Sequence, residues 1–166
     1  MLLIPGLLLG LQLLLGLAPS ALAERTSRAV VLSIGDGDTI RVRQGPRLIT
    51  VRLACIDAPE LDQASDGARA HRYLKTRLTI GSSVTLRPQT MDRFGRTVAE
   101  VIGETNLGLA MVEDGEAFVF RRHLASCDAK QYLDAEARAM RSRLGVWAVP
   151  GGIRRPWDFR RGRRAR

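Results

Sequence analysis

Residues 39–56 read "TIRVRQGPRLITVRLACI", and this stretch decides the fold. Apolar and polar side chains alternate along 39–43, which is the period of a strand with one buried face. The run at 48–56 is longer and rich in β-branched residues, and "QGP" at 44–46 between the two has turn-forming residues. Together with "RAVVLSI" at 28–34, the stretch predicts a three-stranded meander.

The hydrophobic pattern outside this meander predicts five further elements. They are a helix at 65–78, strands at 83–88 and 96–103, and helices at 106–115 and 127–145. Five short strands with helices between them are typical of a five-stranded OB-fold Greek-key barrel. The expected fold class is therefore α+β, mainly β, with about three helices. An open α+β sandwich is the alternative.

Two of these helices carry more detailed signals. In the last one, four apolar residues recur at i, i+4, i+7 and i+11, which predicts its buried face: Leu133, Ala137, Met140 and Leu144. Gly145 follows where a C-terminal cap belongs. For the first helix, we expect Ser65 or Asp66 to cap the N-terminus.

Residues 1–23 have no charged side chain. An apolar run up to Leu17 is followed by Ala21-Leu22-Ala23, a small-x-small ending, which predicts a signal peptide cleaved after Ala23. An uncleaved membrane anchor is the alternative. We therefore expect a secreted or periplasmic protein without a stable membrane partner once the leader is cleaved, with a folded domain at 24–150 and a tail at 151–166.

The charge lies entirely downstream of the leader. The chain has 26 Lys and Arg against 17 Asp and Glu, a net charge of +9. Such an excess attracts polyanions such as nucleic acid, although it also suits a cationic protein kept soluble by its charge. Seven arginines fall in "RRPWDFRRGRRAR" at 154–166, which predicts a basic, disordered arm.

The chain has two cysteines, Cys55 and Cys127. In an exported protein an even number favours a disulfide, with two separate thiols as the alternative. Two cysteines alone cannot form a structural zinc site, and neither histidine has ligand spacing to them.

Two carboxylates lie at the ends of the predicted hairpin. Asp38 starts its first strand and Asp57 ends its second, so pairing of the strands through the turn places both at the same edge, with Thr39 near Ile56. Two converging carboxylates suit a hard cation such as Ca²⁺. The alternative is a turn-forming Asp-Gly and an unrelated Asp at a strand end.

Three motifs together resemble the staphylococcal nuclease-like (thermonuclease) family: "GDGDTI" at 35–40, "VRLACIDAPE" at 51–60 and "DRFGRTVAEV" at 92–101. The resemblance extends over 28–147 and includes "RLGVW" at its end. It implies an OB-fold nuclease that hydrolyses phosphodiester bonds of DNA and RNA with Ca²⁺ as cofactor. We expect a monomer.

The resemblance also implies roles for the carboxylates. Asp38, Asp57 and the backbone carbonyl of Ala58 would hold Ca²⁺, with Asp36 in the outer shell. Glu60 would orient or deprotonate the attacking water, since its carboxylate is ionised at neutral pH.

Two arginines complete the implied catalytic set. Arg52 and Arg96 would stabilise the charge on the phosphate, because guanidinium groups bind phosphate oxygens in a two-point manner. One difficulty remains: five residues separate Arg52 from Asp57, which puts them on opposite faces of a regular strand unless a bulge or bend intervenes.

The implied substrate contacts depart from the family pattern. Arg93 and Phe94 replace a Lys-Tyr pair, so a phenol is lost. Near residue 120 the expected tyrosines are absent, and Phe118, Phe120, Arg121 and His123 lie there instead. Phe120, Arg121 and His123 are candidates for substrate binding, with stacking on a phenylalanine ring in place of a phenol. Phe118 and Phe120 could equally be core residues.

Three functions compete. The first is the secreted Ca²⁺-dependent nuclease, and the second is a catalytically weak nucleic-acid-binding OB-fold protein. The third is an exported cationic adhesion protein, which leaves the carboxylates without a role. The chain has the acidic or basic residue that the implied site requires at every position, and this favours the nuclease.

Overall fold

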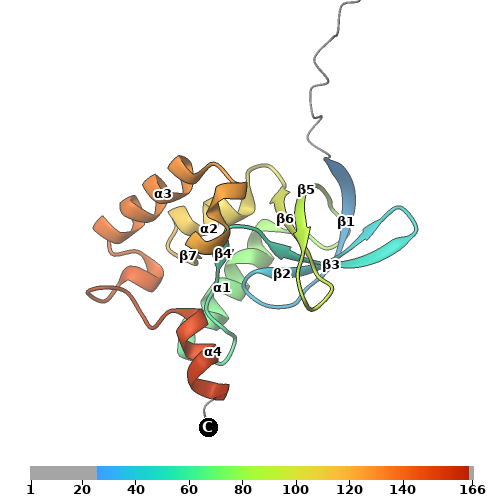
Figure 1. Ribbon diagram of the computed structural model, residues 1–166. Helices are drawn as coiled ribbons and strands as arrows, with labels where there is room; N and C mark the ends of the chain where they lie inside the picture. The colour runs from blue at the N-terminus through green and yellow to red at the C-terminus, as the bar shows by residue number, and fades with distance from the viewer. Residues whose placement is uncertain (1–25, 165–166) are drawn as a thin grey trace, which may run out of the picture.

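A computed structural model describes residues 26–164 as a closed barrel with helices packed around it (Figure 1). The barrel strands follow the order β1-β2-β3-β6-β5. Their bounds are β1 Ser27–Ile34, β2 Thr39–Gln44, β3 Arg47–Leu53, β5 Ser83–Met91 and β6 Thr97–Ile102. β3 and β6 are parallel, and the other neighbours are antiparallel. The five-stranded barrel is confirmed, and the open sandwich is not found.

The helices surround one side of this barrel. They are α1 Ala64–Arg77, α2 Leu107–Glu113, α3 Ala129–Arg141 and α4 Pro156–Arg164, with short 3₁₀ helices η1 Arg121–Ser126 and η2 Gly145–Trp147. In Figure 1 the barrel lies on the right, α2 and α3 on the left, and α4 below them. Of the helices formed by residues 26–164, none has the length and apolar character to cross a membrane.

The third predicted strand is two strands. β3 ends at Leu53, and the chain then turns through Cys55, whose φ of 64° lies in the left-handed region. The next two residues form β4 (Ile56–Asp57), which pairs with β7 (Phe118–Val119) in a separate two-stranded sheet. The chain therefore passes from the barrel into the second sheet at this turn. The side chains after the turn no longer follow the in-and-out alternation of β3.

The hairpin register also differs from the prediction. The turn consists of two residues, Gly45 and Pro46, so Gln44 pairs with Arg47. Counting back from this pair places Thr39 opposite Arg52, and the expectation that Thr39 lies near Ile56 was wrong.

The main core fills the barrel and the space under the helices. Its barrel side chains have essentially no exposed surface: Val31, Ile40, Val42, Val51, Leu86, Ala99 and Val101. A second, smaller cluster contains Phe118, Ala139, Val146 and Trp147. Phe118 is thus a core residue, as one of the two interpretations held.

The buried face of α3 is not the predicted one. Tyr132 and Glu136 are buried, whereas Leu133, Met140 and Leu144 are 40–49% exposed. The buried polar groups have distant partners, because the Tyr132 hydroxyl donates to the Glu100 carboxylate and Glu136 accepts from a backbone N–H of β7.

At α1 the predicted caps were also wrong. The helix follows Gln63, and the Gln63 side chain makes no capping hydrogen bond. Ser65 and Asp66 lie within the first turn.

The predicted disulfide is confirmed. Cys55 and Cys127 form a bridge with an S–S distance of 2.04 Å, which joins the turn after β3 to the residue that follows η1. The bond fixes the point where the chain passes from the barrel into β4.

The tail was predicted to be disordered, and this was wrong for most of it. Residues 156–164 form α4. Pro156 begins the helix, a position that suits its fixed φ and missing N–H. Trp157 packs edge-on against Phe118, with ring centroids 6.2 Å apart, so the helix has an apolar contact that its arginine content conceals. The expected leader at 1–23 lies outside the described residues.

Candidate active site

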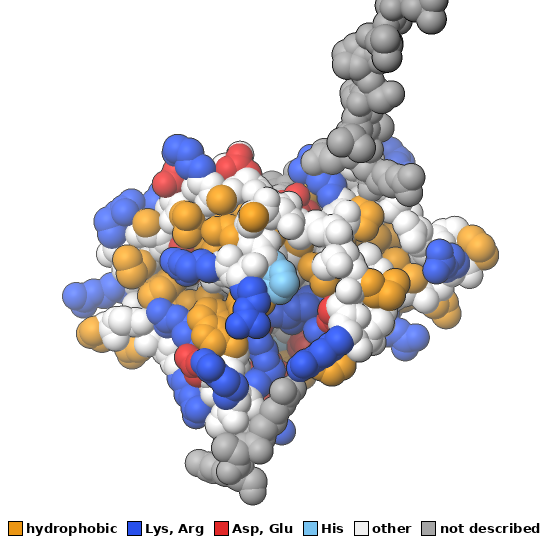
Figure 2. Space-filling model, viewed as in Figure 1, with side chains coloured by type: hydrophobic (Ala, Val, Ile, Leu, Met, Phe, Trp, Pro, Cys, Tyr) orange, Lys and Arg blue, Asp and Glu red, His pale blue; other side chains and the backbone are white. Residues whose placement is uncertain are grey.

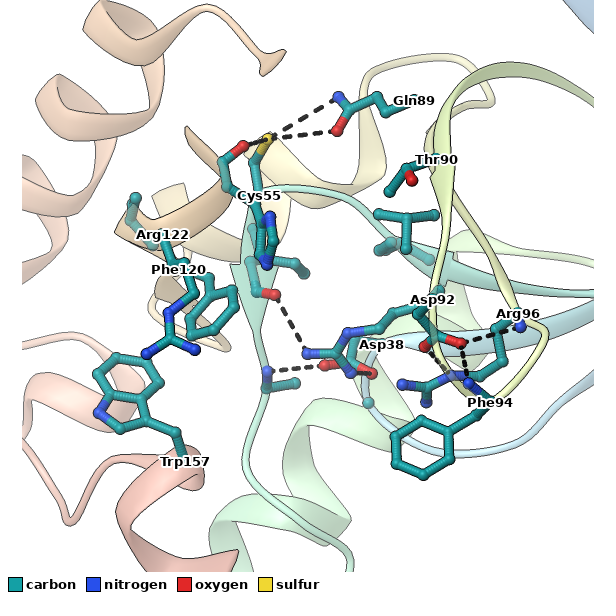
Figure 3. A pocket seen from close by; sticks show the side chains of 18 of the residues that line it. Asp38, Cys55, Gln89, Thr90, Asp92, Phe94, Arg96, Phe120, Arg122 and Trp157 are labelled. Carbon is teal, nitrogen blue, oxygen red and sulfur yellow. Dashed lines mark hydrogen bonds and ion pairs between the residues drawn. The ribbon is translucent and has the colours of Figure 1, made fainter. Parts of the chain in front are cut away.

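A cavity of about 1140 Å³ opens where the barrel meets β4, η1 and α4 (Figure 3). Nearly every predicted site residue lines it: Asp36, Asp38, Arg52, Ala58, Glu60, Arg93, Phe94, Arg96, Phe120, Arg121 and His123. Asp57 does not line it, because this side chain has no exposed surface. The structure therefore brings the predicted residues to one place.

Asp38 is positioned by the loop before β2. Its backbone N–H donates to the Asp36 carboxylate at 3.0 Å, which gives Asp36 a local role. Between them, Gly37 packs so closely that a Cβ there would lie 2.8 Å from the Cβ of Ala58 and 3.0 Å from that of Ala70. Glycine is needed here for space, which fixes the loop against the segment that carries Ala58.

Arg52 joins the two predicted metal ligands. Its Nη1 lies 2.8 Å from Asp38 Oδ1, and its Nη2 lies 2.7 Å from Asp57 Oδ1. The turn at Cys55 makes this possible, because it returns Asp57 to the side on which Arg52 projects. The other Asp38 oxygen accepts from the Ala58 N–H at 3.0 Å. Both carboxylates thus point to one guanidinium.

The charges in this group perturb one another. Burial raises the pKa of Asp38 to about 6, and repulsion by Asp36 and Asp57 adds to this, while Arg52 and the Ala58 N–H act in the opposite direction. For Arg52, burial lowers the pKa, but attraction by Asp38 and Asp57 outweighs it and raises the pKa overall. Arg52 therefore stays charged.

Glu60 is held through its backbone. Its carbonyl accepts from the Gln63 N–H at 2.8 Å, and its own N–H donates to the Gln63 side chain at 3.3 Å. Gly67 in α1 allows this close approach, since a Cβ there would lie 1.8 Å from the Glu60 carbonyl oxygen. The Glu60 carboxylate remains 30% exposed in the cavity.

A second arginine, which the sequence did not predict, reaches the same carboxylates. Arg160 of α4 contacts both oxygens of Asp57, with Nη2–Oδ2 at 2.6 Å and Nη1–Oδ1 at 3.1 Å, and also binds Glu60. The available signal was Trp157 and Phe159 among the tail arginines, following Pro156, which together favour a helix with an anchoring face.

The opposite wall is the loop between β5 and β6. In Figure 3, Asp92, Phe94 and Arg96 face the cavity across from Phe120 and Trp157. Arg96 is paired with Asp92, with Nε–Oδ2 at 2.7 Å, rather than with the buried carboxylates.

The Asp92 carboxylate organises this loop. Burial acts to raise its pKa, but hydrogen bonds from Arg96 and from the Phe94 N–H outweigh this and lower it. Phe94 is 65% exposed, and the Arg93 guanidinium lies 4.8 Å from its ring centroid. A cationic, aromatic loop of this kind suits contact with a nucleotide.

The third wall is aromatic. Phe120 lies 5.4 Å from His123 and 5.6 Å from Trp157, measured between ring centroids. Phe120 is only partly buried, so the core interpretation does not apply to it as it does to Phe118. Arg121 also lines the cavity, and its guanidinium pairs with Glu136 of α3.

The donor groups suit a hard cation. Asp38 and Asp57 already share one positive charge, and both supply carboxylate oxygens. Across residues 26–164, no three acidic, His or Cys side chains cluster as a metal site. Two carboxylates, Asp38 and Asp57, therefore make up the acidic donors at this point.

Known proteins resemble this chain over most of its length. Residues 50–149 match the family described as Staphylococcal nuclease homologue. The chain is 39% identical over 144 residues to a micrococcal nuclease of Shigella flexneri, which covers 81% of this chain and 80% of the relative. It is 35% identical to protein ParB of Escherichia coli (81% and 79% covered) and 35% identical to an uncharacterized endonuclease of Haemophilus influenzae (86% and 78% covered). The chain therefore belongs to the staphylococcal nuclease homologue family.

Proposed function

We propose that the protein is a secreted, Ca²⁺-dependent endonuclease that hydrolyses phosphodiester bonds of DNA and RNA. The observation that carries this proposal is the bridge from Arg52 to Asp38 and Asp57 in a cavity with Glu60 at its side. The family and the names of the relatives support the reaction class.

The surface around the cavity suits a polyanionic substrate. Figure 2 shows Lys and Arg side chains gathered around the hollow of this face and over α4 below it. With a net charge of +9, the protein attracts nucleic acid by its field before any specific contact forms. No base-specific contact is needed for this attraction.

Ca²⁺ would be held by Asp38, Asp57 and the Ala58 carbonyl, with Asp36 in the outer shell. When bound, it would supply positive charge that offsets the charge of the phosphate. The convergence of the two carboxylates and their carboxylate chemistry support this assignment.

The chain's own residues divide the remaining work. The partly exposed Glu60 accepts a proton from the attacking water. Arg52 and Arg96 donate hydrogen bonds to phosphate oxygens from two sides of the cavity, which stabilises the developing charge. Phe94 and Phe120 stack on bases, and Arg93, Arg121 and His123 bind the flanking chain.

Replacing Glu60 tests the catalytic part. We expect Glu60→Gln to lower kcat on double-stranded DNA by two to four orders of magnitude, because the proton acceptor is lost. Oligonucleotide affinity in the same Ca²⁺ buffer should remain within about threefold, since the basic surface is intact. The matched control is Glu104→Gln, which alters an exposed glutamate in the β6–α2 loop.

Three outcomes of this assay are informative. Full turnover by Glu60→Gln would show that Glu60 is not catalytic. Digestion by the wild-type protein that is undiminished in excess EGTA would show that the reaction does not need Ca²⁺. Binding without any cleavage by the wild-type protein would establish the catalytically weak nucleic-acid-binding alternative.

We also propose that residues 1–23 are a signal peptide and that the mature protein acts as a monomer outside the cytoplasm. N-terminal sequencing of exported protein should begin at Glu24, and light scattering should give the mass of one chain. An intact N-terminus in the membrane fraction would instead establish an anchor.

A further inference from the structure

Arg160 neutralises the same groups that the proposed function needs free. Its two Nη atoms contact both oxygens of Asp57, and Nη1 also binds Glu60. Since Arg52 holds Asp57 Oδ1 as well, every Asp57 oxygen is engaged by a guanidinium. An ion that binds Asp57 would lie beside two guanidiniums whose positive charge opposes it, so it competes with them for the carboxylate.

Of the two arginines, Arg160 is the one that can leave. Arg52 belongs to a barrel strand and is paired with Thr39 across the sheet, and its side chain is 15% exposed. Arg160 belongs to a terminal helix, and its side chain is 35% exposed. Burial lowers the pKa of Arg160, but its bonds to Asp57 and Glu60 raise it overall, so deprotonation does not release this contact.

The attachment of α4 suits a removable element. It belongs to neither sheet, and it follows Gly151 and Gly152, both with positive φ. Side chains hold it in place: Trp157 packs against Phe118, and Arg163 pairs with Asp62. The Arg163–Asp62 pair is exposed and screened by salt, so it contributes little to holding α4 in place.

We propose that α4 is an inhibitory arm, in which Arg160 competes with Ca²⁺ for Asp57 and keeps Glu60 paired until the ion displaces it. This inference rests on the proposed function of the same site. With α4 docked, Arg160 holds both Asp57 and Glu60, and loss of the Arg160 contact would leave the Glu60 carboxylate free to accept a proton.

The size of the effect follows from the closed fraction. If the arm is docked in roughly 90–99% of molecules, the apparent Kd for Ca²⁺ is weakened roughly 10- to 100-fold, because only the open fraction binds. Removing the competing charge should recover that factor.

Calorimetric titration of Ca²⁺ into full-length wild-type, Arg160→Gln and Arg161→Gln proteins tests the proposal. We expect Arg160→Gln to bind Ca²⁺ roughly 10- to 100-fold more tightly than wild type. Arg161→Gln removes the same charge from the same helix, but Arg161 pairs with Asp158 of α4 itself, so the contacts that dock the helix are kept and its affinity should stay within about threefold of wild type. Near-ultraviolet circular dichroism checks that each variant is folded.

A second measurement uses only the wild-type protein. Hydrogen–deuterium exchange read by mass spectrometry should rise in 156–164 when Ca²⁺ is added and fall around 36–38. Unchanged exchange in α4, together with equal affinities of wild type and Arg160→Gln, overturns the inhibitory arm while leaving the Ca²⁺ site intact. If none of the three proteins binds Ca²⁺, the metal assignment of the proposed function fails, and the arm fails with it.

Discussion

Two guanidiniums meet at Asp57, and they are held in different ways. Arg52 comes from β3, where the two-residue turn sets the register with β2 and so places Arg52 opposite Thr39. Arg160 comes from a terminal helix that reaches Asp57 from 103 residues away and is held by side chains. The comparison shows which half of the site is built into the barrel and which half is added to it.

Backbone hydrogen bonds support the barrel side of the site. The Leu53 N–H donates to the Asp38 carbonyl, the Ala54 N–H to the Ala99 carbonyl and the Phe120 N–H to the Cys55 carbonyl, each at 2.8 Å. A carboxylate placed by such a network keeps its position when one side chain is lost. The helix side has no equivalent ladder to the barrel.

The largest expected difference is in stability. In EGTA, Arg52→Gln should lower the free energy of unfolding by roughly 3–5 kcal/mol, because Asp38 is left buried without its cation. Arg160→Gln should lower it by about 1 kcal/mol or less, since water screens the 35% exposed Arg160 side chain and the buried Asp57 keeps its pair with Arg52. Urea unfolding of both variants gives the two values. Equal losses would contradict the division of the site into a built-in and an added half.

The disulfide sharpens the same comparison. Replacing Cys55 and Cys127 by alanine should lower the free energy of unfolding by roughly 2–4 kcal/mol, the usual range for a native bridge. Amide exchange should rise more in 53–58, next to the bridge, than in 156–164. A larger rise in α4 would show that the position of the helix depends on this turn, which would contradict the division of the site into two separately held halves.

The sequence predicted the barrel side well, for a physical reason. Strand alternation and turn residues are local signals, and they located Asp38 and Asp57 at one edge. Two features of this edge were not predicted, the hairpin register and the break in the strand at Cys55. With the actual register, a continuous strand would carry Asp57 past Asp38. The turn at Cys55 brings Asp57 back to Asp38, and no alternation pattern could show such a turn.

The added side was missed because its stabilising contacts are distant in sequence. Composition alone made 154–166 too polar to fold, but Trp157 finds Phe118 and Arg160 finds Asp57. The buried face of α3 was predicted wrongly for the same reason, since the hydrogen-bond partner of Tyr132 lies in β6. Helical periodicity gives the element, and the long-range partner decides which face is buried.

The smallest expected effect is a pH dependence of the barrel side. Burial raises the pKa of Asp38 to about 6, above its unfolded value near 4, so the folded protein takes up a proton first as the pH falls. Protons bound preferentially by the folded state stabilise it, and the contribution of Asp38 to the free energy of unfolding should therefore rise by about 1 kcal/mol from pH 7 to pH 5.

Asp38→Asn isolates this contribution, because the asparagine does not titrate and every other group is shared. Urea unfolding in EGTA at pH 7 and pH 5 should show wild type gaining about 1 kcal/mol relative to Asp38→Asn as the pH falls. A relative loss over the same interval would mean that Arg52 outweighs burial and keeps the Asp38 carboxylate stable. In that case the ionised form of Asp38 would not destabilise the folded barrel at neutral pH, and the two halves of the site would differ only in how they are attached.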